Sequence, residues 1–243
     1  MHHFTSTYED YYGHGMREYP VGLRAMYSIV LAILFAFSKI MWRWDFEDAD
    51  KLFDSNSERG TVIICNHTSM AEVIAIVAHI WAKGHRVRPI FKSEFNKTKI
   101  VKWAFSRVGG IPVARGTADL KSLRYAQHAL QRGEDILIFP EGTRIRTDDQ
   151  PVVVHGGFAI IASMGKATIS PMAVCGFRDL TPKGSKITKP LKCWMKAGEK
   201  LSFDDAPNDF KRKEKSTWIE NEAVNLMYAL RDELQAEHPG RKY

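Results

Sequence analysis

Short apolar runs alternate with helix-length stretches along most of this chain, and that alternation constrains the fold more than any other feature. Two of the runs, Thr61–Cys65 and Asp135–Phe139, are rich in branched aliphatic residues and are too short to be helices. Helices that connect successive strands return the chain in the same direction, so such strands pair mainly in parallel. We therefore expect an α/β fold, in which a mixed, mainly parallel central sheet is flanked by helices.

The spacing of apolar residues places the other elements. Helices are expected where apolar residues recur every three or four positions, at 70–82, 98–107, 120–130 and 155–164 and along a stripe at 219–234. Further strands are expected at 86–91, 111–113, 167–174 and 191–197, the last of them at an edge of the sheet.

Polar segments with reactive side chains follow two of the expected strands. The first segment, residues 66–72, contains His67 and Glu72. The second, residues 139–144, supplies a glycine-containing turn with a carboxylate, a hydroxyl and a guanidinium: Glu141, Gly142, Thr143 and Arg144. Because open α/β folds bind ligands where the strands end, we expect both segments at one edge of the sheet.

These side chains suit one kind of reaction. A neutral histidine can take a proton from an alcohol as that alcohol attacks a carbonyl, and a carboxylate on the other ring nitrogen fixes the tautomer and stabilises the imidazolium. The planar guanidinium of an arginine can bind a phosphate through two hydrogen bonds. The pattern indicates transfer of an acyl group to a phosphorylated alcohol. No metal is needed when the acyl donor is a thioester, because a thiolate is a good leaving group.

The sequence from 61 to 174 resembles the 1-acylglycerol-3-phosphate acyltransferase family. Residues 66–72 are similar to its His-x4-Asp block, and residues 139–144 match its Phe-Pro-Glu-Gly-Thr-Arg block residue for residue. Three further blocks have counterparts in the expected order: Lys-x-Glu-Leu at 91–95, Gly-x-Ile-x-x-x-Arg at 110–115 and Val-Pro-Val at 169–174. Several blocks in the right order make a chance match a poor explanation.

The resemblance implies an acyltransferase of phospholipid synthesis. It would move a fatty acyl group from a thioester, acyl-CoA or acyl carrier protein, to the hydroxyl of a lysophosphatidate-like acceptor, without a cofactor or a metal. His67 would be the general base and Glu72 would orient it. The resemblance assigns six residues to the substrate: Lys92, Arg115, Glu141, Gly142, Thr143 and Arg144. Backbone N–H groups near Gly142 are a candidate source of oxyanion stabilisation.

Two positions depart from the family pattern. Glu72 stands where the family usually has aspartate, and Ala114 stands where it often has aspartate. Ser69-x-x-Glu72 is also a capping box for the helix at 70–82, and both roles can coexist because the helix start holds the carboxylate near His67. Two alternatives stay open: another lyso-lipid or glycolipid acceptor, or a catalytically silent lipid-binding homologue. Retention of His67 and of residues 141–144 argues against the silent homologue.

The N-terminal region favours a membrane. Ala25–Ser38 carries no charge, and basic and tryptophan side chains flank or follow it: Arg24, Lys39, Trp42, Arg43 and Trp44. The run is shorter than the roughly 20 residues of a spanning helix, so we expect a helix that lies in the membrane interface, with a core helix covering the sheet as the alternative. The polar leader before it, with His2, His3 and His14, is expected to be a disordered or surface arm. We expect residues 1–50 to form this leader and anchor, and residues 51–243 to form the acyltransferase domain.

Charge and cysteine content limit the partners. The formal net charge is +7, but no RNP motif, zinc finger or helix-turn-helix pattern points to nucleic acid. An anionic membrane surface and phosphorylated substrates account for the charge. Cys65, Cys175 and Cys193 form no Cys-x-x-Cys pair, which predicts neither a zinc site nor a disulfide framework, and Cys65 is expected to be a buried strand residue. We expect a membrane-associated protein at the cytoplasmic face.

Overall fold

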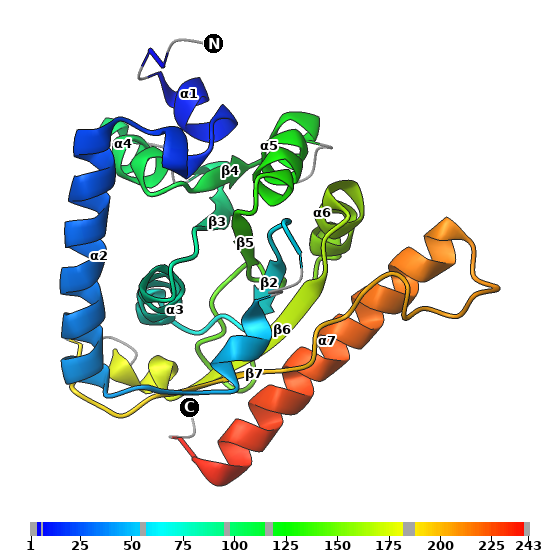
Figure 1. Cartoon of the computed structure of the whole chain (residues 1–243). Coiled ribbons are helices and arrows are strands. Elements are labelled where there is room, and N and C mark those ends of the chain that lie inside the picture. The colour runs from blue at the N-terminus through cyan, green and yellow to red at the C-terminus, as the bar shows by residue number, and fades with distance from the viewer. Residues whose placement is uncertain are drawn as a thin grey trace.

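A seven-stranded sheet runs through the part of the chain that the computed structural model describes, which is residues 4–5, 7–53, 57–94, 98–114, 119–181 and 188–240. The strands lie in the order β1-β7-β6-β2-β5-β3-β4 (Figure 1). Their bounds are β1 Asp45–Glu47, β2 Val62–Cys65, β3 Val87–Lys92, β4 Ile111–Val113, β5 Asp135–Ile138, β6 Ile169–Cys175 and β7 Trp194–Ala197. Among these seven described strands, only β6 and β7 pair antiparallel, which confirms the mixed, mainly parallel sheet.

Helices cover both faces of the sheet. Their bounds are α1 Tyr8–Gly13, α2 Val21–Trp42, α3 Met70–Ala82, α4 Lys99–Arg107, α5 Leu120–Gln131, α6 Gly157–Gly165 and α7 Arg212–Glu237. The central strand β2 is buried on both faces, because Ile63 and Cys65 pack in the core cluster that holds α2 and α3. Val62 and Ile64 pack in the cluster that holds α5, α6 and α7. Alternate residues of one strand therefore join the two halves of the core.

The boundaries predicted from apolar spacing are close to those observed. The helix at 70–82 has the predicted bounds, and the other predicted strands and helices between 61 and 197 begin or end within a few residues of the prediction. The edge position predicted for 191–197 is wrong. β7 pairs with β6 on one side and with β1 on the other, so β1 is the edge strand. β1 has only three residues, two of them acidic, and its sequence gave no strand signal.

The polar leader is folded where the structure describes it, which corrects the prediction of a disordered or surface arm. Tyr11, Tyr12 and Tyr19 are buried, and α1 packs near α4 and α5. The buried guanidinium of Arg88 on β3 donates to the Tyr11 carbonyl at 3.1 Å and to the Glu134 carboxylate at 2.8 Å. Aromatic burial and this buried cation hold the leader on the sheet. His14 belongs to this folded segment, whereas His2 and His3 lie outside the described residues.

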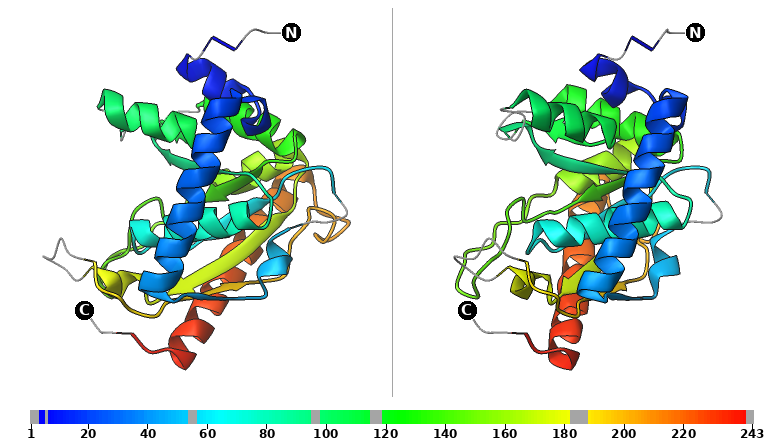
Figure 2. Two further views of the ribbon diagram at one scale, coloured as in Figure 1. Left: turned by 60° about the vertical axis from the view of Figure 1, so that its left-hand side comes forward. Right: turned by 90° about the vertical axis from the view of Figure 1, so that its left-hand side faces the viewer.

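Helix α2 lies on the outside of the molecule and crosses α3 (Figures 1 and 2). It extends beyond the uncharged run at both ends, and its 22 residues are long and apolar enough to cross a membrane. One face, which includes Tyr27, Leu31 and Trp42, is buried. The opposite face is apolar but exposed, and only 17% of the most apolar 18-residue window is buried. A core helix covering the sheet would be mostly buried, so the exposed face argues against that alternative. The length argument against a spanning helix no longer holds, because α2 is longer than the uncharged run.

Candidate active site

The turn after β2 is fixed by the side chain of Asn66. Its amide oxygen accepts the N–H of Val174 on β6 at 2.8 Å, and its amide nitrogen donates to the carbonyl of the same residue at 3.2 Å. Asn66 thereby continues the pairing of β2 with β6 through a side chain while the backbone of β2 turns away. His67 is carried just past the carboxyl edge of the sheet, and its carbonyl accepts the N–H of Ile145 at 2.7 Å.

His67 and Glu72 form a close, sheltered pair. Nδ1 of His67 lies 2.7 Å from Oε1 of Glu72, and the Glu72 side chain is fully buried. The same carboxylate accepts the N–H of Thr68 at 2.6 Å, the Thr68 hydroxyl at 2.7 Å and the N–H of Ser69 at 2.9 Å. Four donors replace the lost water, so the buried carboxylate is well hydrogen-bonded. With Nδ1 donating to this acceptor, Nε2 is the ring nitrogen left to accept a proton.

The carboxylate of Glu72 takes part both in the capping box of α3 and in the contact with His67. Ser69 is the N-cap of α3, its hydroxyl accepts the N–H of Ala71 at 3.2 Å, and Glu72 at the third helical position bonds back to the N–H of Ser69. The capping hydrogen bonds and the contact with His67 therefore coexist on one carboxylate. The imidazole of His67 also stacks on the ring of Phe139, with centroids 4.3 Å apart and planes inclined by 29°. The ring is held by a carboxylate at its edge and an aromatic ring on its face.

The side chain of Glu141 links the second polar segment, residues 139–144, to the first, residues 66–72. Its Oε2 accepts the backbone N–H of His67 at 2.8 Å, and its Oε1 accepts the hydroxyl of Tyr228 from α7 at 3.0 Å. Burial raises the pKa of Glu141, and its hydrogen bonds with His67 and Tyr228 partly offset that rise. Because both oxygens are engaged within the chain, the geometry gives Glu141 a role in positioning His67. The sequence analysis missed Tyr228, although a tyrosine beside the apolar stripe of the last helix is a signal for a buried hydroxyl that needs a partner.

The rest of the second motif forms a tight turn. Gly142 has φ 58°, a left-handed conformation that favours glycine, and its N–H donates to the carbonyl of Phe139 at 2.9 Å. The N–H of Gly142 thus closes the turn, so an oxyanion donor would have to be another group. Thr143 is exposed. Burial lowers the pKa of the half-buried Arg144, the nearby Arg146 guanidinium lowers it further, and Glu72 acts in the opposite direction. Arg146 was not singled out from the sequence.

The two remaining predicted substrate residues belong to the neighbouring strands. Lys92 is the last residue of β3, which runs parallel to β5, so Lys92 lies at the same carboxyl edge as residues 139–144. It is half-buried and pairs in register with Val113. Arg115 lies outside the described residues.

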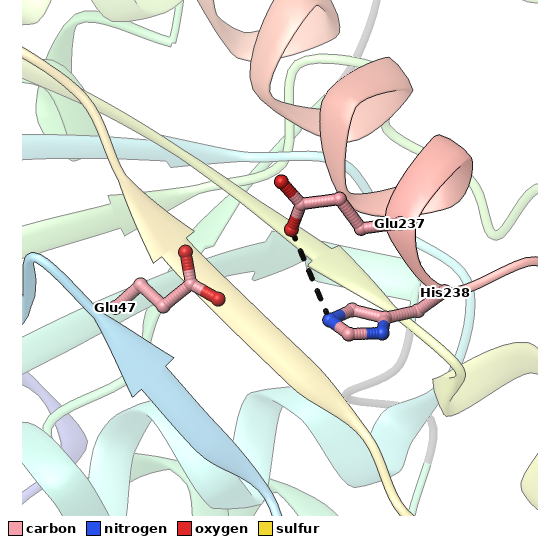
Figure 3. A group of neighbouring side chains, drawn as sticks. All are labelled: Glu47, Glu237 and His238. Carbon is pink, nitrogen blue, oxygen red and sulfur yellow. Dashed lines mark ion pairs between the residues drawn. The ribbon is translucent and has the colours of Figure 1, made fainter.

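Other candidate chemistry carries less weight. Burial raises the pKa of the Cys65 thiol well above its usual value, so Cys65 does not suit a thiolate nucleophile, and it is buried as predicted. Figure 3 shows the carboxylates of Glu47 and Glu237 beside the imidazole of His238. One oxygen or nitrogen atom of each side chain lies within 4.8 Å of those of the other two. The ammonium of Lys196 lies 3.3 Å from the Glu47 carboxylate and 2.6 Å from that of Glu233, so Glu47 already has a cation of the chain beside it.

Comparisons with known proteins identify the family of this chain. A family model described as acyltransferase matches residues 47–175, which include all the predicted site residues. A 1-acyl-sn-glycerol-3-phosphate acyltransferase of Bacillus subtilis is 29% identical over 149 residues, which cover 61% of this chain and 70% of that protein. The chloroplastic 1-acyl-sn-glycerol-3-phosphate acyltransferase LPAT1 of Arabidopsis thaliana is 26% identical over 54% of this chain, but the match spans only 36% of the plant protein.

A solved structure shares the fold. The crystal structure of the 1-acyl-sn-glycerophosphate acyltransferase PlsC from Thermotoga maritima superposes with a TM-score of 0.63 and 22% sequence identity. The superposition covers 87% of this chain and 82% of the other. The mixed sheet, its flanking helices and the N-terminal apolar helix are therefore an arrangement already seen in a solved protein.

Proposed function

The chain belongs to the acyltransferase family, and we propose that it transfers a fatty acyl group from an acyl thioester to the free hydroxyl of a lysophosphatidate-like acceptor in phospholipid synthesis. The observation that carries the proposal is the buried pair of His67 and Glu72, joined through Glu141 to a turn that bears Arg144. The relatives named above are acyltransferases of 1-acyl-sn-glycerol-3-phosphate, which supports an acceptor that carries a phosphate and a free hydroxyl.

The reaction needs one base. Nε2 of His67 takes the proton of the acceptor hydroxyl as its oxygen attacks the thioester carbonyl. The imidazolium that forms is stabilised by the Glu72 carboxylate, 2.7 Å from Nδ1. The tetrahedral intermediate then collapses, the carbon–sulfur bond breaks, and the thiolate leaves and takes the proton from His67. The products are the ester and the free thiol, and His67 returns to its neutral form.

Cationic side chains around this edge suit a phosphate. Arg144 and Arg146 come from the turn after β5, and Lys92 comes from the end of β3. We propose that Arg144 and Lys92 hold the acceptor's phosphate, together with Arg115 and the Thr143 hydroxyl, and that Gly142 shapes the turn that presents them. The positive charges of Arg144 and Arg146 repel each other, so an anion bound between them would be attracted to both and would offset that repulsion.

The exposed face of α2 supports a membrane location. It presents a continuous stripe of large apolar side chains, 43% to 74% exposed: Met26, Ile29, Val30, Ile33, Phe37 and Ile40. We propose that this stripe lies in the membrane interface, at the cytoplasmic face, and brings the active site to its lipid substrates. In the proposed division, residues 1–50 supply the anchor and residues 51–243 the acyltransferase domain, although β1 from the first part completes the sheet of the second.

An acyl-transfer assay of the purified protein tests the proposal. The protein is given lysophosphatidate, other lyso-lipids and a glycolipid, each with acyl-CoA and with acyl carrier protein as donor. We expect turnover of lysophosphatidate with at least one donor, and a loss of about 10²- to 10⁴-fold in His67→Ala. Turnover with another acceptor only would move the function to that lipid. A folded protein that transfers no acyl group to any acceptor would overturn the proposal in favour of a silent lipid-binding homologue.

A further inference from the structure

A basic cavity lies at the amino-terminal end of α2, away from the site described above. Its volume is about 380 Å³. One wall is a face of α2 and the other comes from the leader and from the residue before β3; together they are Met16, Arg17, Tyr19, Val21, Arg24, Ala25, Tyr27, Ser28 and Arg86. The lining includes three arginines and no carboxylate. Within the described part of the chain, no ion pair engages Arg17, Arg24 or Arg86.

Two further features make this cavity favourable for an anion. Helix α2 begins at Val21, which lines the cavity, and no side chain caps its first N–H groups, so the positive end of the helix dipole is at the cavity wall. Tyr27 also belongs to the lining. It is 8% exposed, and its hydroxyl has no hydrogen-bond partner among the described residues.

The nearby carboxylates do not cancel this charge. Glu134 is bound to Arg88 at 2.8 Å and lies 3.7 Å from Arg132, so two other arginines already share it. The carboxylate of Glu18 accepts the N–H of Gly15 at 3.2 Å. Glu18 keeps its negative charge but is not part of the lining, so three arginines against this one carboxylate leave a local excess of positive charge.

The cavity is distinct from the acyl-transfer site. Arg86 directly precedes β3, so the cavity lies at the amino edge of the sheet, whereas His67 follows the carboxyl end of β2. β2 and β3 both run parallel to β5. The six residues of β3 separate the two edges by about 20 Å at roughly 3.3 Å per residue. A phosphate bound in this cavity would therefore not belong to the acceptor molecule whose hydroxyl meets His67.

We propose that this cavity binds the phosphate headgroup of an anionic membrane lipid. The cavity lies at the amino-terminal end of the helix that carries the exposed apolar stripe: Val21 is 71% exposed and lines the cavity, and Ile29 lies two turns further along the same helix. The proposal requires Arg17, Arg24 and Arg86 to lie at the depth of the lipid phosphates when the stripe lies in the interface. Apolar lining from Val21 meets the glycerol and the first part of the acyl chains. The inference rests on the proposed membrane association and not on the acyl-transfer step.

Vesicle binding by the full-length protein tests the proposal. Wild type and the double variant R24Q/R86Q are compared on phosphatidylcholine vesicles with and without phosphatidylglycerol. The matched control R212Q/K213Q removes the same charge from exposed positions at the start of α7, on the other face of the sheet (Figure 1). We expect R24Q/R86Q to lose about 10- to 30-fold in affinity for the anionic vesicles, from about 1 kcal/mol per arginine, and to bind neutral vesicles like wild type. The control should change by less than threefold.

Other outcomes would overturn the proposal. Equal losses in R24Q/R86Q and in the control would mean that only net charge matters. Full displacement of anionic vesicles by millimolar glycerol 3-phosphate would assign the cavity to a soluble phosphate, and displacement by acyl-CoA would assign it to the donor. Retained acyl transfer on detergent-solubilised lysophosphatidate by R24Q/R86Q separates this site from the proposed function. If wild type itself ignores vesicles of both kinds, the membrane association fails and this inference fails with it.

Discussion

Replacing Glu72 with glutamine changes one carboxylate oxygen into an NH2 group and leaves the size of the side chain nearly unchanged. Four donors face that carboxylate, at 2.6 to 2.9 Å, and the side chain is fully buried. A single amide oxygen cannot accept from both the Thr68 and the Ser69 backbone N–H groups if the amide nitrogen faces one of them. A buried N–H without an acceptor costs about 1–3 kcal/mol, and the loss of charge weakens the remaining bonds, so we expect a destabilisation of about 2–4 kcal/mol.

The same substitution removes the charge that supports the imidazolium. We expect turnover to fall by about 10²- to 10⁴-fold, because His67 loses both its fixed tautomer and its electrostatic partner. The melting temperature should fall by about 4–16 °C for a chain of this length, so turnover is measured well below the transition of the variant.

A matched variant separates catalysis from helix capping. Ser69→Ala removes the reciprocal hydrogen bond to the N–H of Ala71 and leaves the Glu72 carboxylate in place. It should cost about 1 kcal/mol of stability and little turnover. Glu72→Asp keeps the charge on a shorter side chain, and we expect intermediate turnover. If Glu72→Gln folds and turns over like wild type, the carboxylate is only a cap, and the proposed mechanism loses its orienting group.

Three further predictions follow from the contacts above. Tyr228→Phe removes a 3.0 Å hydrogen bond to Glu141, so it should lower stability by about 1 kcal/mol and turnover severalfold; unchanged values in denaturant unfolding and in the acyl-transfer assay would contradict the positioning role. The pKa of Glu141 is raised above 4.5 in the folded state, so the folded state holds the proton of this carboxyl more tightly than the unfolded state does. The unfolding free energy of wild type, relative to that of Glu141→Gln, should therefore fall as the pH rises from 4.5 through the raised pKa. A difference in unfolding free energy that does not change with pH would refute this. Ile29→Asp and Ile33→Asp, at positions 61% and 62% exposed, should each weaken vesicle binding tenfold or more without unfolding the protein, whereas Ile160→Asp on α6 should not; equal effects would rule out the stripe as the contact.

The spacing of apolar residues was enough to predict the fold class, because each central strand is buried on both faces. Runs such as 62–65 and 136–139 have no polar residue to confuse strand with loop, and the helices between them have a clear period. The pattern failed at β1, which has three residues and takes its stability from pairing with β7. It failed again in the leader, where a partner 70 or more residues away, the buried Arg88, decides whether the aromatic side chains are covered. Neither signal is local, so neither could be found by spacing.

The site was partly predictable for the same reason. His67, Glu72 and residues 139–144 could be identified because their chemistry is concentrated in short motifs. Tyr228 and Arg146 could not, because their importance comes from packing: one reaches Glu141 from the last helix and the other lies near Arg144. The carboxylate of Glu141 was assigned to the substrate by resemblance, whereas its contacts here are with the chain itself. Sequence motifs identify which residues meet, but the partner of each oxygen depends on the fold.

The glutamate at position 72 links the base to the folding of its own turn. Its carboxylate accepts from three consecutive residues, His67, Thr68 and Ser69, while its backbone lies in the first turn of α3. A side chain at this helical position must reach back over the N-cap to meet those donors, and the extra methylene of glutamate supplies that reach. Forming the first turn of α3 therefore also sets the tautomer and the direction of the His67 ring. One carboxylate therefore caps the helix and holds the His67 imidazole at the same time.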